Sequence, residues 1–347
     1  MTTGVSPPNK GADDPIAIFE EIRALREANR REREPKTARR ILRLAHLAGL
    51  ALLERAKADS PDHPDPALDQ LPECDQLPEF DRDDVTPEVL RAAIVRSGCL
   101  LVRGAVDEQD VTRLVDGIGR AYAVREAQPR ARSAGDGYFE EFEPDPRFDL
   151  RFDRGVIRGG TALLAADSPQ VLFDVIDALE RAGLGRLAAD YLGDRLAMSV
   201  NKCLLRRASP GLLAASYGRG GSKLSAWHQD GAFLGDVRAL NVWLSLSHCG
   251  DDAPGLDVVP RRLDRIVPTG TTEAVFDWSA SRAVAEEAAG DVGVVRPIFE
   301  PGDALLFDEL LLHATAAEPG MRSTRYAVEN WFFGPSSFPS KHTPLAF

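Results

Sequence analysis

One histidine-aspartate pair, His228 and Asp230, with a second histidine far downstream at His313, constrains the fold of this chain more than any other feature. Two imidazoles and one carboxylate on one face of a metal suit non-haem ferrous iron and leave coordination positions open. Because residues i and i+2 of a strand point the same way, His228 and Asp230 can bind one ion from a single strand. His313 must then come from another strand, so the pattern predicts a core built from strands.

A His-x-Asp pair alone carries little weight, because such short matches arise by chance. This chain contains a second one, His63 and Asp65, within a stretch of alternating prolines at 60–66. Prolines at that spacing exclude a paired central strand, so we interpret this match as part of a linker. His228 differs because an apolar stretch follows it as far as Leu246.

The sequence around His313 also predicts a turn followed by a strand. Glu300–Asp303 contains a Pro-Gly pair typical of a tight turn, with glycine at a positive φ. Ala304–Phe307 then has the composition of a buried strand. A histidine that follows three leucines could instead be a hydrogen-bonded core residue, which is the commoner role of a lone histidine.

Two arginines after His313 weaken that alternative. Arg322 and Arg325 precede an apolar stretch at 326–333 that predicts another strand. A guanidinium at this position can bind a carboxylate of a dicarboxylic acid through two parallel hydrogen bonds. Strand alternation favours Arg325, which enters the strand, over Arg322 in the turn before it, and both remain candidates.

Five segments occur in an order and spacing typical of one enzyme family. They are Gly98–Gly104 with Asp107–Val111, Trp227–Asp230, Asn241–Leu246, Gly255–Pro260, and Pro301–His313 ending at Arg325. From about Val85 to Phe333 the chain resembles the phytanoyl-CoA dioxygenase family of iron- and 2-oxoglutarate-dependent oxygenases. Members of that family often continue the proline with Gly-Ser-His, where this chain has Arg261–Leu263.

The resemblance implies a set of cofactors and ligands. Fe(II) is expected at His228, Asp230 and His313, with O2 and the co-substrate 2-oxoglutarate bound beside it. The expected contacts of 2-oxoglutarate are Arg325 or Arg322, Trp243, Lys202 and Gln229. Because Asp230 is present, the resemblance favours hydroxylation, desaturation or ring formation over halogenation.

Alternatives stay open for two of these residues. Trp243 shares a strand face with Asn241 and Ser245, and a solvated outer face explains that alternation as well as a cofactor-lined cavity does. The resemblance favours the cavity. Lys202 is equally consistent with an ordinary surface lysine.

Composition narrows the functional class. The chain has 347 residues, 44% of them hydrophobic and 28% charged, as expected for a globular protein. A net charge of −12 argues against a general nucleic-acid binder. We find no membrane-spanning run and no signal-peptide pattern, and we expect a cytoplasmic protein. Four scattered cysteines, Cys74, Cys99, Cys203 and Cys249, fit free thiols in a reducing compartment.

The sequence divides into four parts. Residues 1–14 are predicted to be disordered, 15–59 to form a helical extension divided at Pro35, and 60–84 to form a linker. Residues 85–347 are predicted to form the oxygenase domain, which starts with a helix capped by Thr86. A single helix is expected over 169–192. With helices first and strands later, we predict an α+β domain whose core is a double-stranded β-helix, a jelly-roll or cupin-like sandwich with flanking helices.

A basic cluster marks the predicted N-terminal helices. Its members are Arg26, Arg30, Arg31, Arg33, Lys36, Arg39, Arg40 and Arg43. Such a cluster can dock an acidic partner or nucleic acid, but it more often forms a solvated face or packs on an acidic body or a second subunit. We favour the second group, so self-association through these helices is one possibility.

These features lead to one principal hypothesis and two alternatives. The principal one is a non-haem iron- and 2-oxoglutarate-dependent dioxygenase that oxidises an unactivated C–H bond of a small-molecule metabolite. The alternatives are a non-catalytic ligand-binding β-sandwich that acts as a sensor, and an oxygenase that modifies a protein or nucleic acid. The sequence does not identify the substrate.

Overall fold

The computed structural model describes residues 15–56, 61–73, 77–127, 135–158, 162–211, 226–235 and 237–347. The segment 1–14 that we predicted to be disordered lies outside these residues. The described helices are α1 (Pro15–Arg31), α2 (Pro35–Glu54), α3 (Pro87–Ser97), α4 (Glu108–Ala127), α5 (Arg151–Arg158), α6 (Pro169–Arg181), α7 (Leu184–Leu192), α9 (Gly231–Leu234) and α10 (Arg282–Ala289). Among them, none combines the length and apolar character needed to cross a bilayer.

The strands build two sheets. They are β1 (Glu79–Asp81), β2 (Cys99–Arg103), β3 (Ala162–Leu164), β4 (Ala197–Ser199), β5 (Leu204–Ala208), β6 (Ala239–Ser245), β7 (Gly255–Val258), β8 (Ala304–Phe307), β9 (His313–Ala316), β10 (Arg325–Phe333) and β11 (Pro344–Ala346). Within the described residues, nine strands join in one sheet along the path β1-β2-β8-β6-β10-β4-β11, with β5 paired to β10 and β3 paired to β5. Strands β7 and β9 pair in the second sheet.

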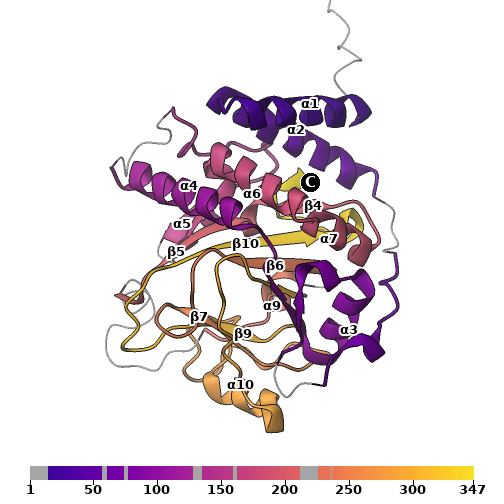
Figure 1. Cartoon of the computed structure of the whole chain (residues 1–347), viewed down its shortest axis with the longest axis vertical. Coiled ribbons are helices and arrows are strands. Elements are labelled where there is room, and N and C mark those ends of the chain that lie inside the picture. Colours follow the sequence, from indigo (N-terminus) through magenta and orange to yellow (C-terminus); the bar gives the residue numbers. More distant parts are fainter. Residues whose placement is uncertain are drawn as a thin grey trace, which may run out of the picture.

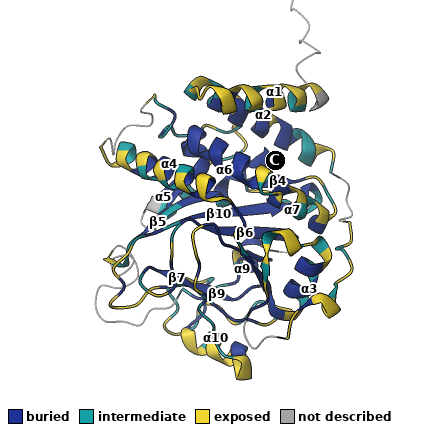
Figure 2. Ribbon diagram, viewed as in Figure 1, coloured by how far each residue is buried: buried dark blue, intermediate teal, exposed yellow. Residues whose placement is uncertain are grey.

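The large sheet separates two hydrophobic layers (Figure 1). On one side α6, α4 and α7 cover it, α2 packs against β11 and α6, and α1 lies beyond α2; on the other side lie β7, β9 and α10. Alternation along β6 explains the division, because Val242 and Leu244 pack into the helix-side core while Trp243 packs into the core between the sheets. Both faces of β6 are buried (Figure 2). The solvated outer face that we considered for Trp243 is therefore wrong.

The arrangement of the two sheets confirms the predicted α+β fold with a double-stranded β-helix core. The second sheet is short and is extended by single antiparallel bridges, including His228 with His313 and Val258 with Val295. The strand predicted over Ala304–Phe307 is confirmed, because β8 begins and ends at these residues. Strand β1 lies inside the stretch that we predicted as linker and pairs in parallel with β2.

Local sequence signals explain the helix boundaries. Thr86 accepts a hydrogen bond from the Val89 amide and Pro87 occupies the first position of α3, as predicted. The single helix predicted over 169–192 is wrong, because α6 ends at Arg181 and α7 begins at Leu184. Gly183 lies between them at φ 73°, a left-handed conformation that ends a helix.

The basic cluster packs on the protein's own acidic surface. Arg33, Arg30 and Arg26 of α1 and the turn after it form ion pairs with Asp174, Asp177 and Glu180 of α6. The three carboxylates recur every three residues along α6, so the two segments match charge by charge. Arg39 of α2 pairs in the same way with Glu140. This confirms the acidic-body alternative for these four arginines.

A glycine in the turn before β8 provides a test of the fold. Gly302 has φ 98°, and a Cβ added there would lie 2.6 Å from the carbonyl oxygen of Val106. We expect Gly302→Ala to lower the free energy of unfolding by about 1–3 kcal/mol, because alanine is strained at this φ and the backbone must shift. The measurement is chemical unfolding followed by circular dichroism. In the control Gly119→Ala, a Cβ meets nothing within 4 Å on α4, and unchanged or higher stability is expected. Equal effects of both substitutions would contradict this account of the turn.

Candidate metal centre

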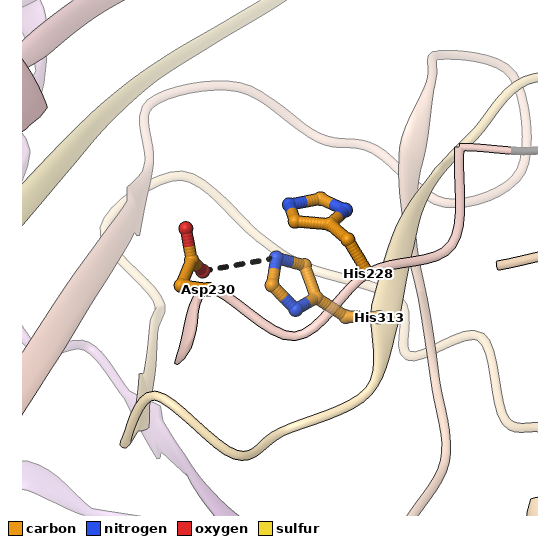
Figure 3. A group of neighbouring side chains, drawn as sticks. All are labelled: His228, Asp230 and His313. Atoms are coloured by element: carbon orange, nitrogen blue, oxygen red, sulfur yellow. Dashed lines mark ion pairs between the residues drawn. The ribbon is translucent and has the colours of Figure 1, made fainter. Parts of the chain in front are cut away.

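Two histidines face each other across adjacent extended segments at the edge of the second sheet. The His228 amide donates to the His313 carbonyl oxygen at 2.8 Å, and the His313 amide donates back at 3.0 Å. Residues paired in this way across an antiparallel bridge project their side chains to the same side. The two rings consequently lie next to each other (Figure 3), with their centroids 4.3 Å apart.

Asp230 completes the group from a turn rather than from a strand. Its backbone has φ −62° and ψ −26° at the start of α9, so the prediction of one strand carrying both His228 and Asp230 is wrong. The chain turns away after His228, yet the carboxylate still faces the histidines, with Oδ2 3.8 Å from Nε2 of His313. The candidate ligand atoms of His228, Asp230 and His313 all lie within 4.8 Å of one another.

Both imidazoles are oriented by carbonyls of their own segments. Nδ1 of His228 lies 2.8 Å from the Ala226 carbonyl oxygen, and Nδ1 of His313 lies 3.0 Å from that of Leu311. A carbonyl only accepts, so each Nδ1 carries the proton and each Nε2 keeps its lone pair for a metal. Burial, reinforced by His313, lowers the pKa of His228 to about 4. His228 is therefore neutral at pH 7, as metal binding requires.

A buried ion pair borders the group on β10. Glu329 accepts hydrogen bonds from Nε of Arg206 at 2.9 Å and from Nη2 at 2.5 Å. Burial alone would raise the pKa of Glu329, but Arg206 and Lys202 together outweigh it and lower this pKa to about 2. Sequence reasoning missed Glu329, although it lies four residues after Arg325 and therefore on the same face of the strand.

The structure separates the two candidate arginines. Arg325 is 1% exposed, donates from Nη1 to the carbonyl oxygens of Pro254 at 3.3 Å and Gly255 at 3.0 Å, and lies 5.4 Å from the Trp243 ring centroid. Arg322 has a side chain that is 85% exposed and pairs with Asp252 at 3.2 Å. Arg325 is thus buried beside Trp243 of the core between the sheets, whereas Arg322 lies at the surface.

Lys202 and Gln229 lie beside the group in different ways. The Lys202 ammonium is 3.5 Å from Oδ1 of Asp230 and 4.0 Å from the Phe233 ring centroid. It is therefore not an ordinary surface lysine. The Gln229 amide donates to the carbonyl oxygens of Arg265 and Leu310 and accepts from the Val267 amide. Because these contacts use the Gln229 amide to join two loops, we interpret Gln229 as a positioning residue and not as a co-substrate contact.

The second His-x-Asp match lies elsewhere. His63 places Nδ1 3.1 Å from the Tyr191 carbonyl oxygen and packs its ring on Tyr191, 4.6 Å between centroids. Among the described residues, only His228, Asp230 and His313 form a group of three that could hold a metal ion.

Comparison with known proteins gives one family match. The sequence profile of the phytanoyl-CoA dioxygenase family matches residues 94–324, which include all three candidate ligands. No curated protein sequence matches the chain.

Several solved structures resemble the chain. EctD from S. alaskensis in its apoform is 20% identical, with a TM-score of 0.47 over 82% of this chain and 87% of that chain. EctD with 2-oxoglutarate and 5-hydroxyectoine is 19% identical, with a TM-score of 0.48 over 82% and 86%. The epimerase SnoN, in complex with Fe3+, alpha ketoglutarate and nogalamycin RO, is 15% identical, with a TM-score of 0.46 over 71% and 83%.

The positioning role of Gln229 can be tested by stability. Gln229 is 1% exposed, and Gln229→Leu leaves the three backbone partners without their hydrogen bonds. We expect the free energy of unfolding to fall by about 2–4 kcal/mol, measured by denaturant titration. Gln109→Leu on the exposed surface of α4 is the control and should change it by less than about 0.5 kcal/mol. Unchanged stability together with weaker 2-oxoglutarate binding would restore the co-substrate role.

Proposed function

The chain belongs to the phytanoyl-CoA dioxygenase family and is a 2-oxoglutarate-dependent non-haem iron oxygenase, and on this premise we propose which of its residues carry the reaction. His228, Asp230 and His313 hold the ferrous iron. The observation that carries this proposal is the convergence of their ligand atoms within 4.8 Å, with both Nδ1 atoms turned away toward carbonyl oxygens. Three protein ligands would leave coordination positions of the ion open for the co-substrate and O2.

Arg325 is the residue that we propose for the far carboxylate of 2-oxoglutarate. Its guanidinium is buried beside Trp243 in the core between the sheets, where a carboxylate would meet little competition from water. Nη1 is oriented by the carbonyl oxygens of Pro254 and Gly255, which lie four and three residues before Val258, the strand partner of His313. Trp243 supplies an apolar wall for the carbon chain of the co-substrate.

The roles of the remaining residues follow from their contacts. Bound together, ferrous iron and 2-oxoglutarate activate O2 to supply the oxidant that attacks a C–H bond. Glu329 is kept ionised by Arg206 and Lys202, and its two hydrogen bonds with Arg206 orient that guanidinium. The buried walls formed by Trp243, Phe299 and Phe307 exclude water from the side that faces the sheet.

We propose a small-molecule substrate rather than a macromolecule. The arginines of α1 and α2 that could recruit nucleic acid or an acidic protein are instead paired with α6 and with Glu140 of the same chain. For the same reason we do not propose self-association through these arginines. Buried, unpaired Cys99, Cys203 and Cys249 fit the cytoplasmic location that we propose.

The first test is spectroscopic. We expect anaerobic addition of ferrous iron and 2-oxoglutarate to produce a visible charge-transfer band, because both chelating oxygens of the co-substrate then bind the metal. His228→Ala should abolish the band by removing one of three protein ligands. His63→Ala alters the second His-x-Asp match, whose ring packs on Tyr191, and should retain it. A wild-type protein that gives no band, or a His228→Ala variant that keeps it, would contradict the iron site.

The second test separates the two arginines. We expect Arg325→Gln to raise the Kd of 2-oxoglutarate by at least about tenfold, because a charge-assisted carboxylate contact of roughly 1.5–3 kcal/mol is lost. Arg322→Gln alters only an exposed ion pair and should leave the Kd within about twofold. Titration of the charge-transfer band measures both values. The assignment fails if Arg322→Gln has the larger effect.

A further inference from the structure

Aromatic rings extend from the candidate metal ligand His228 to the protein surface. The Trp278 ring lies edge-to-face with His228 at 5.4 Å and with Phe233 at 5.1 Å between centroids. Phe276 stacks on Trp278 at 4.6 Å with an interplanar angle of 9°. We call Phe233, Trp278 and Phe276 the aromatic platform.

Hydrogen bonds hold the loop that carries Phe276 and Trp278 in position. Ala280 donates its amide to the Trp227 carbonyl oxygen at 2.7 Å, which fixes the Phe276–Trp278 loop to the residue before His228. Within the loop, the Ser279 hydroxyl accepts from the Phe276 amide at 2.9 Å, and the Gly270 amide donates to the Ser279 carbonyl oxygen at 2.9 Å. These contacts hold Trp278 in one place relative to the candidate metal.

Part of the platform faces solvent. Phe233 is 36% exposed and Phe276 is 40% exposed. By contrast, the three tryptophans outside the platform, Trp227, Trp243 and Trp331, are buried in the cores. Single exposed apolar side chains are common, but neighbouring ones beside a reactive centre mark a ligand surface. Flat aromatic faces favour a planar partner, which can stack on them.

The positive charge of Lys202 at the inner edge of the platform favours a ligand that carries a negative charge. Lys202 lies over Phe233, and its carboxylate partner among the described residues is Asp230. A metal bound by Asp230 would draw on that negative charge and leave the Lys202 ammonium able to bind another anion. Of two other carboxylates on this side, Glu329 is paired with Arg206, and Asp153 accepts a hydrogen bond from the neutral Asn201 amide.

The platform and the proposed site of the far carboxylate use different contacts. Lys202 contacts Asp230 and Phe233, whereas Arg325 contacts the carbonyl oxygens of Pro254 and Gly255 and lies beside Trp243. Arg325 thus provides the cation for the far carboxylate of 2-oxoglutarate, and the metal would hold the near one. An anion at Lys202 would then come from a different molecule, the substrate.

We propose that the substrate is a planar, largely apolar ring compound that carries an acidic group. Its ring packs on Phe233, Trp278 and Phe276, and its acidic group binds Lys202, so that a C–H bond between them faces the metal. This inference rests on the iron site of the proposed function and adds the substrate class to it. Phe233, Trp278 and Lys202 are then specificity-determining residues.

Four matched probes test the class. They are 2-naphthoate (planar, anionic), 2-naphthylmethanol (planar, neutral), 2-naphthylmethylammonium (planar, cationic) and decahydro-2-naphthoate (anionic, not planar). Calorimetry on the anaerobic protein loaded with ferrous iron and 2-oxoglutarate gives each Kd, and a shift of the charge-transfer band reports binding beside the metal. We expect 2-naphthoate to bind at least about fivefold more tightly than each of the other three and to shift the band.

Variants assign the contacts. Trp278→Ala should weaken 2-naphthoate binding by roughly three- to tenfold through loss of ring packing. Lys202→Met should weaken 2-naphthoate but not 2-naphthylmethanol, and it should leave the Kd of 2-oxoglutarate within about twofold. Leu68→Ala, at a residue that is 52% exposed in the stretch before β1, should change neither. Retained charge-transfer bands in all variants show that each is folded and loaded.

The outcomes separate this inference from the proposed function. If the band forms but the probes bind in another order, or do not bind, the substrate class is wrong and the iron site stands. If Lys202→Met chiefly weakens 2-oxoglutarate, Lys202 serves the co-substrate and the inference is overturned. If the wild-type protein forms no band, the proposed function itself fails.

Discussion

The backbone bridge between His228 and His313 is the contact on which the site depends. Two reciprocal amide-to-carbonyl hydrogen bonds place these residues opposite each other and turn both rings to one side. The large sheet fixes the position of this pair indirectly, because β8 lies in that sheet and leads into the segment before β9. An error of one residue in this pairing would turn one imidazole away from the metal group. The fold therefore determines the chemistry through register.

The charged side chains around this bridge occupy separate positions. Arg325 lies at one end of the inward face of β10, and Glu329 with Arg206 lies further along it. Lys202 contacts Asp230 and lies over Phe233. Each of these charges has an oriented partner, which is what makes a charged interior tolerable. In the proposal made above, this separation provides one cation for a co-substrate and another for a substrate.

The sequence predicted those features correctly whose residue types and spacing are compatible with few backbone conformations. The Pro-Gly turn and β8 follow from turn chemistry and strand period, and strand alternation also separates Arg325, which starts β10, from the exposed Arg322 in the turn before it. Alternation left the side of Trp243 open, and only the family resemblance favoured its inward position. The prediction of one strand for both His228 and Asp230 failed because a backbone turn, not a strand, positions the Asp230 carboxylate. Asp230 reaches the group from the start of α9, and nothing in the His-x-Asp spacing distinguishes the two routes. Gln229 also needed the structure, because its partners come from residues 265–267 and 310. The aromatic platform likewise depends on a loop whose position is set by long-range contacts.

Diffraction from crystals grown without oxygen, with ferrous iron and 2-oxoglutarate and at the iron absorption edge, tests the central claim most directly. This account predicts one strong anomalous peak bonded to Nε2 of His228, Nε2 of His313 and the Asp230 carboxylate. It also predicts the far carboxylate of 2-oxoglutarate at Arg325. An iron peak at His63, a metal bound without Asp230, or a co-substrate held at Arg322 would contradict it.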